Sequence, residues 1–138
     1  MNIKKQINGI QHIGIPTNDI EKTVCFYKGL GFEVALETVN EAAGEKVAFL
    51  QMKNLTIETY ENGCSEMKAG AIDHIAMDVT GIDTLFSEIK AAGHTMIHDS
   101  VQFLPFWKHG VRFFTILGPN EEKIEFSEML TSPADDVE

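Results

Sequence analysis

The stretch IDHIAMD at residues 72–78 decides the fold of this chain, because it repeats an earlier stretch, IQHIGI at residues 10–15. His74 follows His12 by 62 positions, and each histidine opens a short apolar segment. That segment runs into a helical pattern that ends at a glycine. The same interval separates Ile20 from Ile82 and Gly31 from Gly93. The chain is therefore predicted to be a tandem repeat of one structural unit.

Each half of the chain closes on a similar tripeptide with a glutamate at its centre, IET at residues 57–59 and IEF at residues 124–126. The two glutamates, Glu58 and Glu125, lie 67 positions apart, so the second half carries about five additional residues. Each copy of the unit thus has one histidine and one glutamate at matching places.

The composition is that of a soluble globular protein and limits the partners it can have. The 138 residues are 43% hydrophobic and 23% charged, which predicts a single domain over residues 1–138. The net charge of −10 argues against a nucleic-acid partner, and no apolar run reaches the roughly 18 residues of a membrane span. Two distant cysteines, Cys25 and Cys64, and an opening without an apolar leader favour a cytoplasmic protein with reduced thiols.

The first module is expected to span about residues 8–62 in the order β-α-β-β-β. Pro16 ends the first strand, and Asn18 with Glu21 three positions later is the pattern of a capping box at a helix start. Gly29 or Gly31 is expected to end that helix. The expected strands lie at residues 10–15, 32–38, 46–52 and 55–61.

The second module, about residues 72–128, repeats this order after a joint at residues 62–71. Its helix is expected near residues 81–92, and Thr131 to Glu138 is expected to be a frayed acidic tail. The inserted residues fall in a loop at 100–110 that is rich in large apolar side chains. The expected strands lie at residues 72–79, 95–99, 111–117 and 123–128.

The four repeated residues are predicted to share one sheet face. Alternation along each strand sends the neighbouring isoleucines to the core, so His12, Glu58, His74 and Glu125 lie on the face that the helices leave open. Two imidazoles and two carboxylates suit one divalent ion such as Zn, Ni, Co, Mn or Fe. The alternative for any one of them is a solvated surface residue, but four at repeat-related positions with matching parity favour a metal site.

With these modules and residues, the chain resembles the vicinal oxygen chelate superfamily, which includes glyoxalase I, methylmalonyl-CoA epimerase, extradiol dioxygenases and fosfomycin resistance proteins. The resemblance covers about residues 8–128. It implies an α+β fold in which the modules form a curved, mostly antiparallel eight-stranded sheet, usually in homodimers. The matching segments are QHIGI at 11–15, FY at 26–27, GLGF at 29–32, DHIA at 73–76, GPN at 118–120 and KIEF at 123–126.

The resemblance also implies an activity, because Glu58 stands in the fourth ligand place, as in glyoxalase I and the epimerase. Such enzymes stabilise an enediolate on the metal while a carboxylate moves the proton. Glu125 is the implied base and Glu58 its counterpart. We therefore expect a glyoxalase I-like lyase or isomerase acting on a small 2-oxo or hemithioacetal substrate. The alternatives are an acyl-CoA epimerase and a non-catalytic module that binds a metabolite or drug.

Two departures from the glyoxalase I pattern bear on the substrate. Ile15-Pro16 stands where many of those enzymes have an arginine suited to a glutathione carboxylate, and Glu121 replaces a turn glycine. The thiol of any adduct therefore stays open. The inserted loop offers an apolar pocket wall and basic groups for an anion, although ordinary packing and surface charge explain these residues equally well. The pocket candidates are Phe103, Phe106, Trp107, Lys108 and Arg112.

Overall fold

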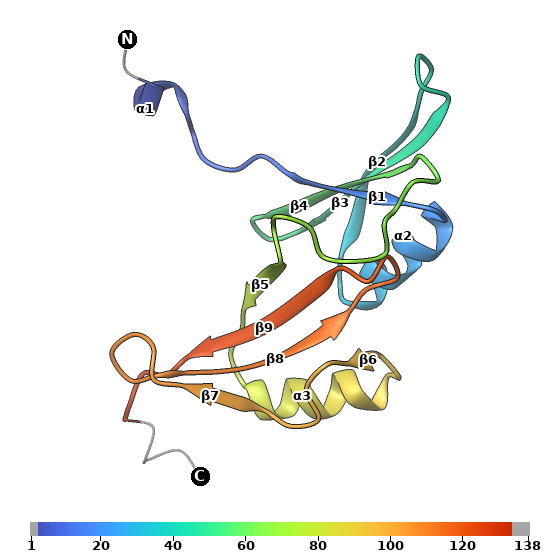
Figure 1. Ribbon diagram of the computed structural model, residues 1–138. Coiled ribbons are helices and arrows are strands. Elements are labelled where there is room, and N and C mark those ends of the chain that lie inside the picture. The colour runs from blue at the N-terminus through green and yellow to red at the C-terminus, as the bar shows by residue number, and fades with distance from the viewer. Residues whose placement is uncertain (1–2, 134–138) are drawn as a thin grey trace. The chain divides into compact units, whose positions relative to one another are not determined.

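The computed structural model describes residues 3–133 and divides the chain into two compact units, one ending at Glu66 and one beginning at Met67. Figure 1 labels the helices and strands of each unit. Within residues 3–133, none of the helices has the length and apolar character needed to span a bilayer. The far end of the expected acidic tail, residues 134–138, lies outside the described residues.

The first unit is a four-stranded sheet with one helix packed on it (Figure 1). The strand order is β1-β4-β3-β2, with β1 parallel to β4 and the other pairs antiparallel. Helix α2 contacts β2, β3 and β4. The elements are α1 (Ile3–Gln6), β1 (Ile13–Thr17), α2 (Ile20–Gly29), β2 (Glu33–Asn40), β3 (Glu45–Met52) and β4 (Leu55–Glu61).

The second unit repeats this plan, with the strand order β5-β9-β8-β6 and β5 parallel to β9. Helix α3 contacts β8 and β9. A short further strand, β7, pairs with β8 on the same edge as β6, so β6 and β7 together take the place that β2 has beside β3 in the first unit. The elements are β5 (His74–Asp78), α3 (Ile82–Ala91), β6 (Thr95–Met96), β7 (Gln102–Leu104), β8 (Val111–Leu117) and β9 (Lys123–Met129).

The fold class predicted from the sequence is confirmed: two β-α-β-β-β modules with mostly antiparallel strands. Several boundaries differ from those expected. Strand β1 starts at Ile13 and runs through Pro16, which an edge strand tolerates because its outer N–H groups pair with no neighbour. The loop at 100–110 contains β7, and residues 3–6 of the expected polar lead-in form α1.

The cores of the two units are built from the faces that the isoleucine pattern predicted. In the first unit Ile57 and Tyr27 are fully buried, and in the second Ile124 and Phe114 are fully buried. The side chains at 58 and 125 alternate with these and are only partly buried. Burial of these apolar side chains is the main source of stability in each unit.

The start of α2 differs from the predicted capping box. Asp19, not Asn18, is the N-cap, and its side chain accepts a hydrogen bond from the N–H of Lys22. The side chain of Asn18 instead accepts from the N–H of Ser65. Asn18 is one residue too early because the chain leaves β1 at Thr17 rather than at Ile15.

Both helices are capped by a glutamate from the last strand of their own unit. The carboxylate of Glu61 accepts from the N–H of Ile20 at 2.8 Å. The carboxylate of Glu128 accepts from Gly81 and Ile82, at 3.2 and 3.0 Å. The two glutamates are 67 positions apart, the interval that also separates Glu58 from Glu125. A negative charge at a helix N-terminus pairs with its free N–H groups and its dipole, so the repeat conserves this tie in both units.

Candidate metal ligands and the adjoining cavity

The first unit brings His12 and Glu58 together. Strands β1 and β4 run parallel, and Gly14 is the register partner of Glu58, so His12 lies two positions before that partner. Nε2 of His12 is 3.4 Å from Oε1 of Glu58. The ring of Phe49, on the neighbouring strand β3, meets the ring of His12 edge to face at 5.6 Å. These contacts hold both groups on the face opposite α2.

The second unit repeats this pair in the same register. Ala76 is the partner of Glu125 across β5 and β9, and His74 lies two positions before Ala76. Nε2 of His74 is 3.9 Å from Oε1 of Glu125. The side chains of both pairs keep 21–44% of their area exposed, so each remains open to a small ligand.

Each histidine is also held at its other ring nitrogen by the residue that precedes it. Nδ1 of His12 lies 2.9 Å from Oε1 of Gln11, and Nδ1 of His74 lies 2.9 Å from Oδ2 of Asp73. Both oxygens are acceptors, so each Nδ1 carries the hydrogen and donates it. In the neutral ring, this leaves the Nε2 lone pair free on the side of the glutamate. Proteins commonly orient a metal-binding imidazole in this way.

Asp73 has a second partner, the ammonium group of Lys123, whose Nζ is 3.0 Å from its Oδ1. The hydrogen bonds from His74 and Lys123 hold the pKa of the Asp73 carboxyl below its usual value. Asp73 therefore stays ionised at neutral pH and available to His74. Lys123, in turn, is occupied by Asp73.

The donor atoms fit a divalent ion, because each unit presents one imidazole nitrogen and one carboxylate side by side. Within residues 3–133, no group of three or more His, Cys, Asp or Glu side chains lies close enough together to hold a metal. The structure thus brings the predicted ligands together in pairs. Their combination in one site stays a prediction.

A cavity of about 510 Å³ lies beside His74 and Glu125 in the second unit. It opens on the face of the sheet opposite α3 and is closed on one side by the inserted loop. Asp78, at the end of β5, is a further acidic residue on its wall. The remaining lining residues are Ala76, Met77, Leu104, Phe106, Trp107, Val111, Phe113, Ser127 and Met129.

The five predicted pocket residues have different places. Phe106 and Trp107 line the cavity. Phe103 is not among its described lining residues; its ring lies over Gly110, where an added Cβ would clash with it. Lys108 is exposed. Arg112 faces the other side of the sheet, toward α3.

Arg112 binds Asp83 of α3 through two hydrogen bonds of 2.7 and 2.8 Å. This ion pair lowers the pKa of Asp83 and raises that of Arg112. On β8, Val111 and Phe113 point toward the cavity of His74, so strand alternation turns Arg112 away from it. Arg112 lines another cavity, together with Glu128 and the start of α3.

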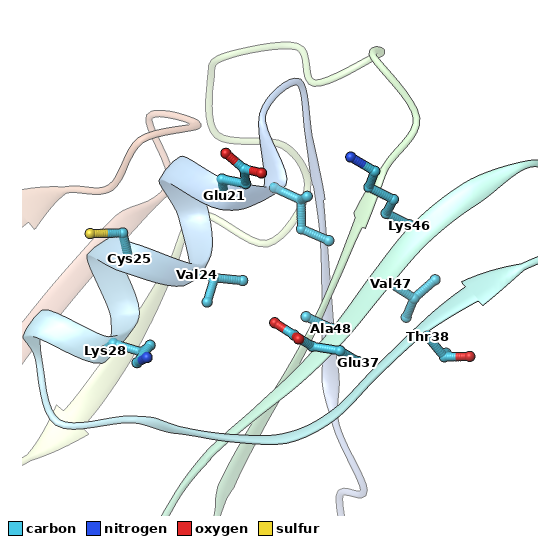
Figure 2. A pocket seen from close by; sticks show the side chains of 10 residues that line it. Glu21, Val24, Cys25, Lys28, Glu37, Thr38, Lys46, Val47 and Ala48 are labelled. Atoms are coloured by element: carbon cyan, nitrogen blue, oxygen red, sulfur yellow. The ribbon is translucent and has the colours of Figure 1, made fainter.

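The first unit has its own cavity of about 460 Å³ between α2 and strands β2 and β3, shown in Figure 2. Val24 of α2 and Ala48 of β3 lie on its walls, while the thiol of Cys25 points away from the strands (Figure 2). Lys28 and Lys46 are balanced there by Glu21 and Glu37. His12 and Glu58 are not among its described lining residues, so this cavity is separate from the candidate ligands.

Sequence reasoning missed Gln11 and Asp73 as partners of the histidines, and Asp78 as a wall residue. A signal for the first two exists, because each histidine of the repeat follows a residue with a side-chain oxygen. The only sequence signal for Asp78 was its even spacing from His74 on β5, which places both side chains on the same face of the sheet. The helix-capping glutamates had a clearer signal, since Glu61 and Glu128 each follow a ligand candidate by three positions.

Solved structures of low sequence identity share this fold. A protein named SMU.1112c matches with a TM-score of 0.75 and 19% identity, over 88% of this chain and 99% of its own. A glyoxalase family protein from Enterococcus faecalis matches with a TM-score of 0.73 and 20% identity, over 89% and 99%. FosX from Listeria monocytogenes, a fosfomycin resistance protein solved with Mn(II) and sulfate, matches with a TM-score of 0.70 and 21% identity, over 91% and 95%.

No curated protein sequence matches the chain significantly. A family model, in contrast, matches residues 9–126, which include both His–Glu pairs and the strands that carry them. This span contains nearly the whole of both modules. The chain therefore belongs to the Glyoxalase/Bleomycin resistance protein/Dioxygenase superfamily.

Proposed function

We propose that this protein is a metal-dependent lyase or isomerase, similar to glyoxalase I, that moves a proton next to a carbonyl group of a small 2-oxo or hemithioacetal substrate. One observation carries the proposal: each unit sets a histidine and a glutamate side by side in the same strand register, with the histidine Nδ1 held by a side-chain oxygen. Surface residues have no reason to repeat both features. The proposed ligands of one divalent ion are His12, Glu58, His74 and Glu125.

The chain's own groups would divide the chemistry between them. A divalent ion, when bound, would stabilise negative charge on substrate oxygens beside the C–H bond that breaks. Glu125 accepts the carbon-bound proton and returns it to the neighbouring carbon, and Glu58 is the second carboxylate for this transfer. His12 and His74 would hold the ion through Nε2, because Gln11 and Asp73 accept the hydrogen of their Nδ1 atoms.

The structural relatives support a divalent ion without specifying it. FosX has the same fold and was solved with Mn(II). At about 20% identity, this likeness extends to the fold, and the metal of this chain stays a proposal among Zn, Ni, Co, Mn and Fe. The cavity beside His74 and Glu125 offers a place for an organic substrate next to the proposed base.

Elemental analysis tests the metal directly. The purified chain, stripped with a chelator and reloaded with each candidate ion, should retain about one ion per chain after desalting, because the two imidazoles and two carboxylates would together hold a single ion. A Glu58→Ala, Glu125→Ala double variant should lose most of it. Equal retention by both proteins would mean that these residues do not bind metal.

Proton transfer is tested in deuterated water. Methylglyoxal with several thiols, and a panel of acyl-CoA thioesters, should be incubated with the loaded protein and followed by NMR. Deuterium at the carbon next to the carbonyl, formed only with the metal-loaded protein, supports the proposed reaction. Exchange with the acyl-CoA panel alone would instead favour the epimerase.

We also propose that the protein acts as a homodimer. Strand β2 is an edge strand of eight residues, all exposed, and it presents Val34, Leu36 and Val39 to solvent. Long exposed edges with apolar side chains are normally covered in stable proteins. Light scattering at micromolar concentration should give the dimer mass. A monomer mass with full activity would refute the dimer.

A binding module without catalysis is the alternative of a different class, because the apolar cavity would serve it as well. Such a module has no need of matched His–Glu pairs. It predicts ligand binding that is independent of metal and no deuterium incorporation with any substrate, and the two experiments above separate it from the enzyme.

A further inference from the structure

We propose that the cavity beside His74 and Glu125 selects uncharged apolar or aromatic substrates and rejects anionic ones. The inference deepens the proposed function, because it names the class of substrate for the same site. It concerns the part of the substrate that does not react. The lining of the cavity, the charges around it and the conformation of the inserted loop all favour such substrates.

Apolar side chains form most of the cavity wall. They come from three directions: Phe113 from the sheet, Met129 from the end of β9, and Leu104, Phe106 and Trp107 from β7 and the loop after it. Rings and thioether-bearing side chains favour flat apolar groups through dispersion and the exclusion of water. A substrate with a phenyl-sized group next to its carbonyl fits a cavity of about 510 Å³.

The charged residues on the wall are acidic. Glu125 and Asp78 both line the cavity, and among the described residues that line it none is lysine or arginine. The two basic residues of the flanking strands are engaged elsewhere: Arg112 binds Asp83, and Lys123 binds Asp73. In the metal-free protein, a carboxylate or phosphonate in this cavity would lose hydration and face two like charges, which makes the free energy of binding less favourable; Asp78 keeps its charge beside the cavity when a metal is bound to Glu125.

The loop that closes the cavity is held in a defined conformation. Trp107 has φ 63°, in the left-handed region that bulky residues rarely adopt. Such strain persists only where the surroundings impose it, and it gathers at ligand-binding sites. The ring of Phe103 packs over Gly110, three positions after Trp107, and leaves no room for a Cβ where the loop turns at that glycine. Trp107 is thereby set at the rim of the cavity, with 73% of its surface exposed.

Trp107 is also the only tryptophan of the sequence, so its fluorescence reports directly on occupancy of this cavity. Two probes of similar shape but different charge are compared. 1-Phenyl-1,2-propanedione is uncharged, and phenylglyoxylate is an anion. The titrations use metal-free protein, so that chelation of a metal by either probe does not contribute. A Trp107→Phe variant supplies the background emission of the tyrosines and the probes, and free N-acetyltryptophanamide supplies the correction for light absorbed by the probes.

The uncharged probe should bind at least about tenfold more tightly than the anion, and Phe106→Ala should weaken it severalfold by removing wall area. Asp78→Asn should reduce the ratio of the two dissociation constants, anion over uncharged probe, by about three- to tenfold, because it removes one negative charge close to the bound anion. Glu88→Gln is the matched control. It makes the same change of net charge on an exposed residue of α3, away from the cavity, and should leave the preference unchanged.

The proposal is overturned if phenylglyoxylate binds as tightly as the uncharged probe, or if Glu88→Gln narrows the preference as much as Asp78→Asn. It is equally overturned if Lys108→Ala abolishes binding of the anion, since that lysine would then recognise it. Because the protein is free of metal throughout, these results are independent of the proposed metal and reaction. A failure of one proposal is thus distinguishable from a failure of the other.

Discussion

The carboxylate of Asp73 accepts a hydrogen bond from Nδ1 of His74 at 2.9 Å, and this contact leaves Nε2 as the ring nitrogen that is available to a ligand. Gln11 does the same for His12 at the same distance. Each of these hydrogen bonds joins adjacent residues, so it needs only the local backbone conformation at the start of the strand. Their repetition in both units is the strongest structural argument that Nε2 has a function.

Removal of such a hydrogen bond should weaken metal binding without removing a ligand. Asp73→Ala frees the ring of His74 to rotate and to change tautomer, and loss of such a partner typically costs about 10- to 100-fold in metal affinity. Competition with a fluorescent chelator measures this. Asp99→Ala, which removes an exposed aspartate outside the candidate site, is the control. Equal affinities for the two variants would show that Asp73 does not orient the ligand.

Replacement of the proposed base should damage catalysis more than binding. Glu125→Gln keeps the size of the side chain and one oxygen donor but removes its basicity, and loss of a general base typically lowers the rate by about 10²- to 10⁴-fold. Metal occupancy should fall less, because the other three ligand candidates remain. Rates and metal content are measured on the same preparation.

The comparison with Glu58→Gln shows which of the two carboxylates is the base. If Glu125→Gln keeps its metal and turns over at the wild-type rate, Glu125 is not the base. An inactive Glu58→Gln protein beside an active Glu125→Gln protein would exchange the two roles and keep the chemistry.

The glutamate that caps α3 should contribute to stability. Glu128→Gln removes a negative charge that accepts from two N–H groups at the helix start, and loss of such a cap costs about 0.5–2 kcal/mol. Urea unfolding measures the change in the free energy of unfolding. Glu88→Gln, within the same helix, is the matched control and should change it by less than about 0.5 kcal/mol. A loss for Glu128→Gln no larger than that of the control would contradict the capping role.

The ion pair between Asp83 and Arg112 predicts a pH dependence of stability. Arg112 lowers the pKa of Asp83, so the pair stabilises the fold above the ordinary aspartate value of 3.8 and loses this contribution as the pH falls through the lowered pKa. Asp83 is 68% exposed, so the contribution is small, about 0.2–1 kcal/mol at neutral pH.

Thermal unfolding of the wild type and Asp83→Asn between pH 2 and 7 tests this. The variant should be less stable at pH 7, and the two midpoints should converge as the pH falls below 3.8. Asp99→Asn is the control for loss of one charge. A difference between wild type and Asp83→Asn that stays constant down to pH 2 would contradict the ion-pair origin.

Much of the fold was predictable because its signals are local. Alternation along a strand places Ile57 and Ile124 in the core, and it therefore places Glu58 and Glu125 on the opposite face, whatever the strands pair with. The repeat interval adds that the two halves share one plan. The strand that was missed, β7, has only three residues, too few for an alternating pattern to be recognised.

The sequence by itself determined the two modules, the parity of their strands and the place of one histidine and one glutamate in each, because these follow from periodicities of a few residues. Tertiary structure alone decided the partners of the polar side chains that pair across different elements. Arg112 was one of the basic residues considered for an anion, and the packing of α3 against β8 sets Asp83 within 2.7 Å of it. A partner 29 positions away is invisible to local pattern, since it depends on how whole elements pack, and packing determines which charges remain free to meet a substrate.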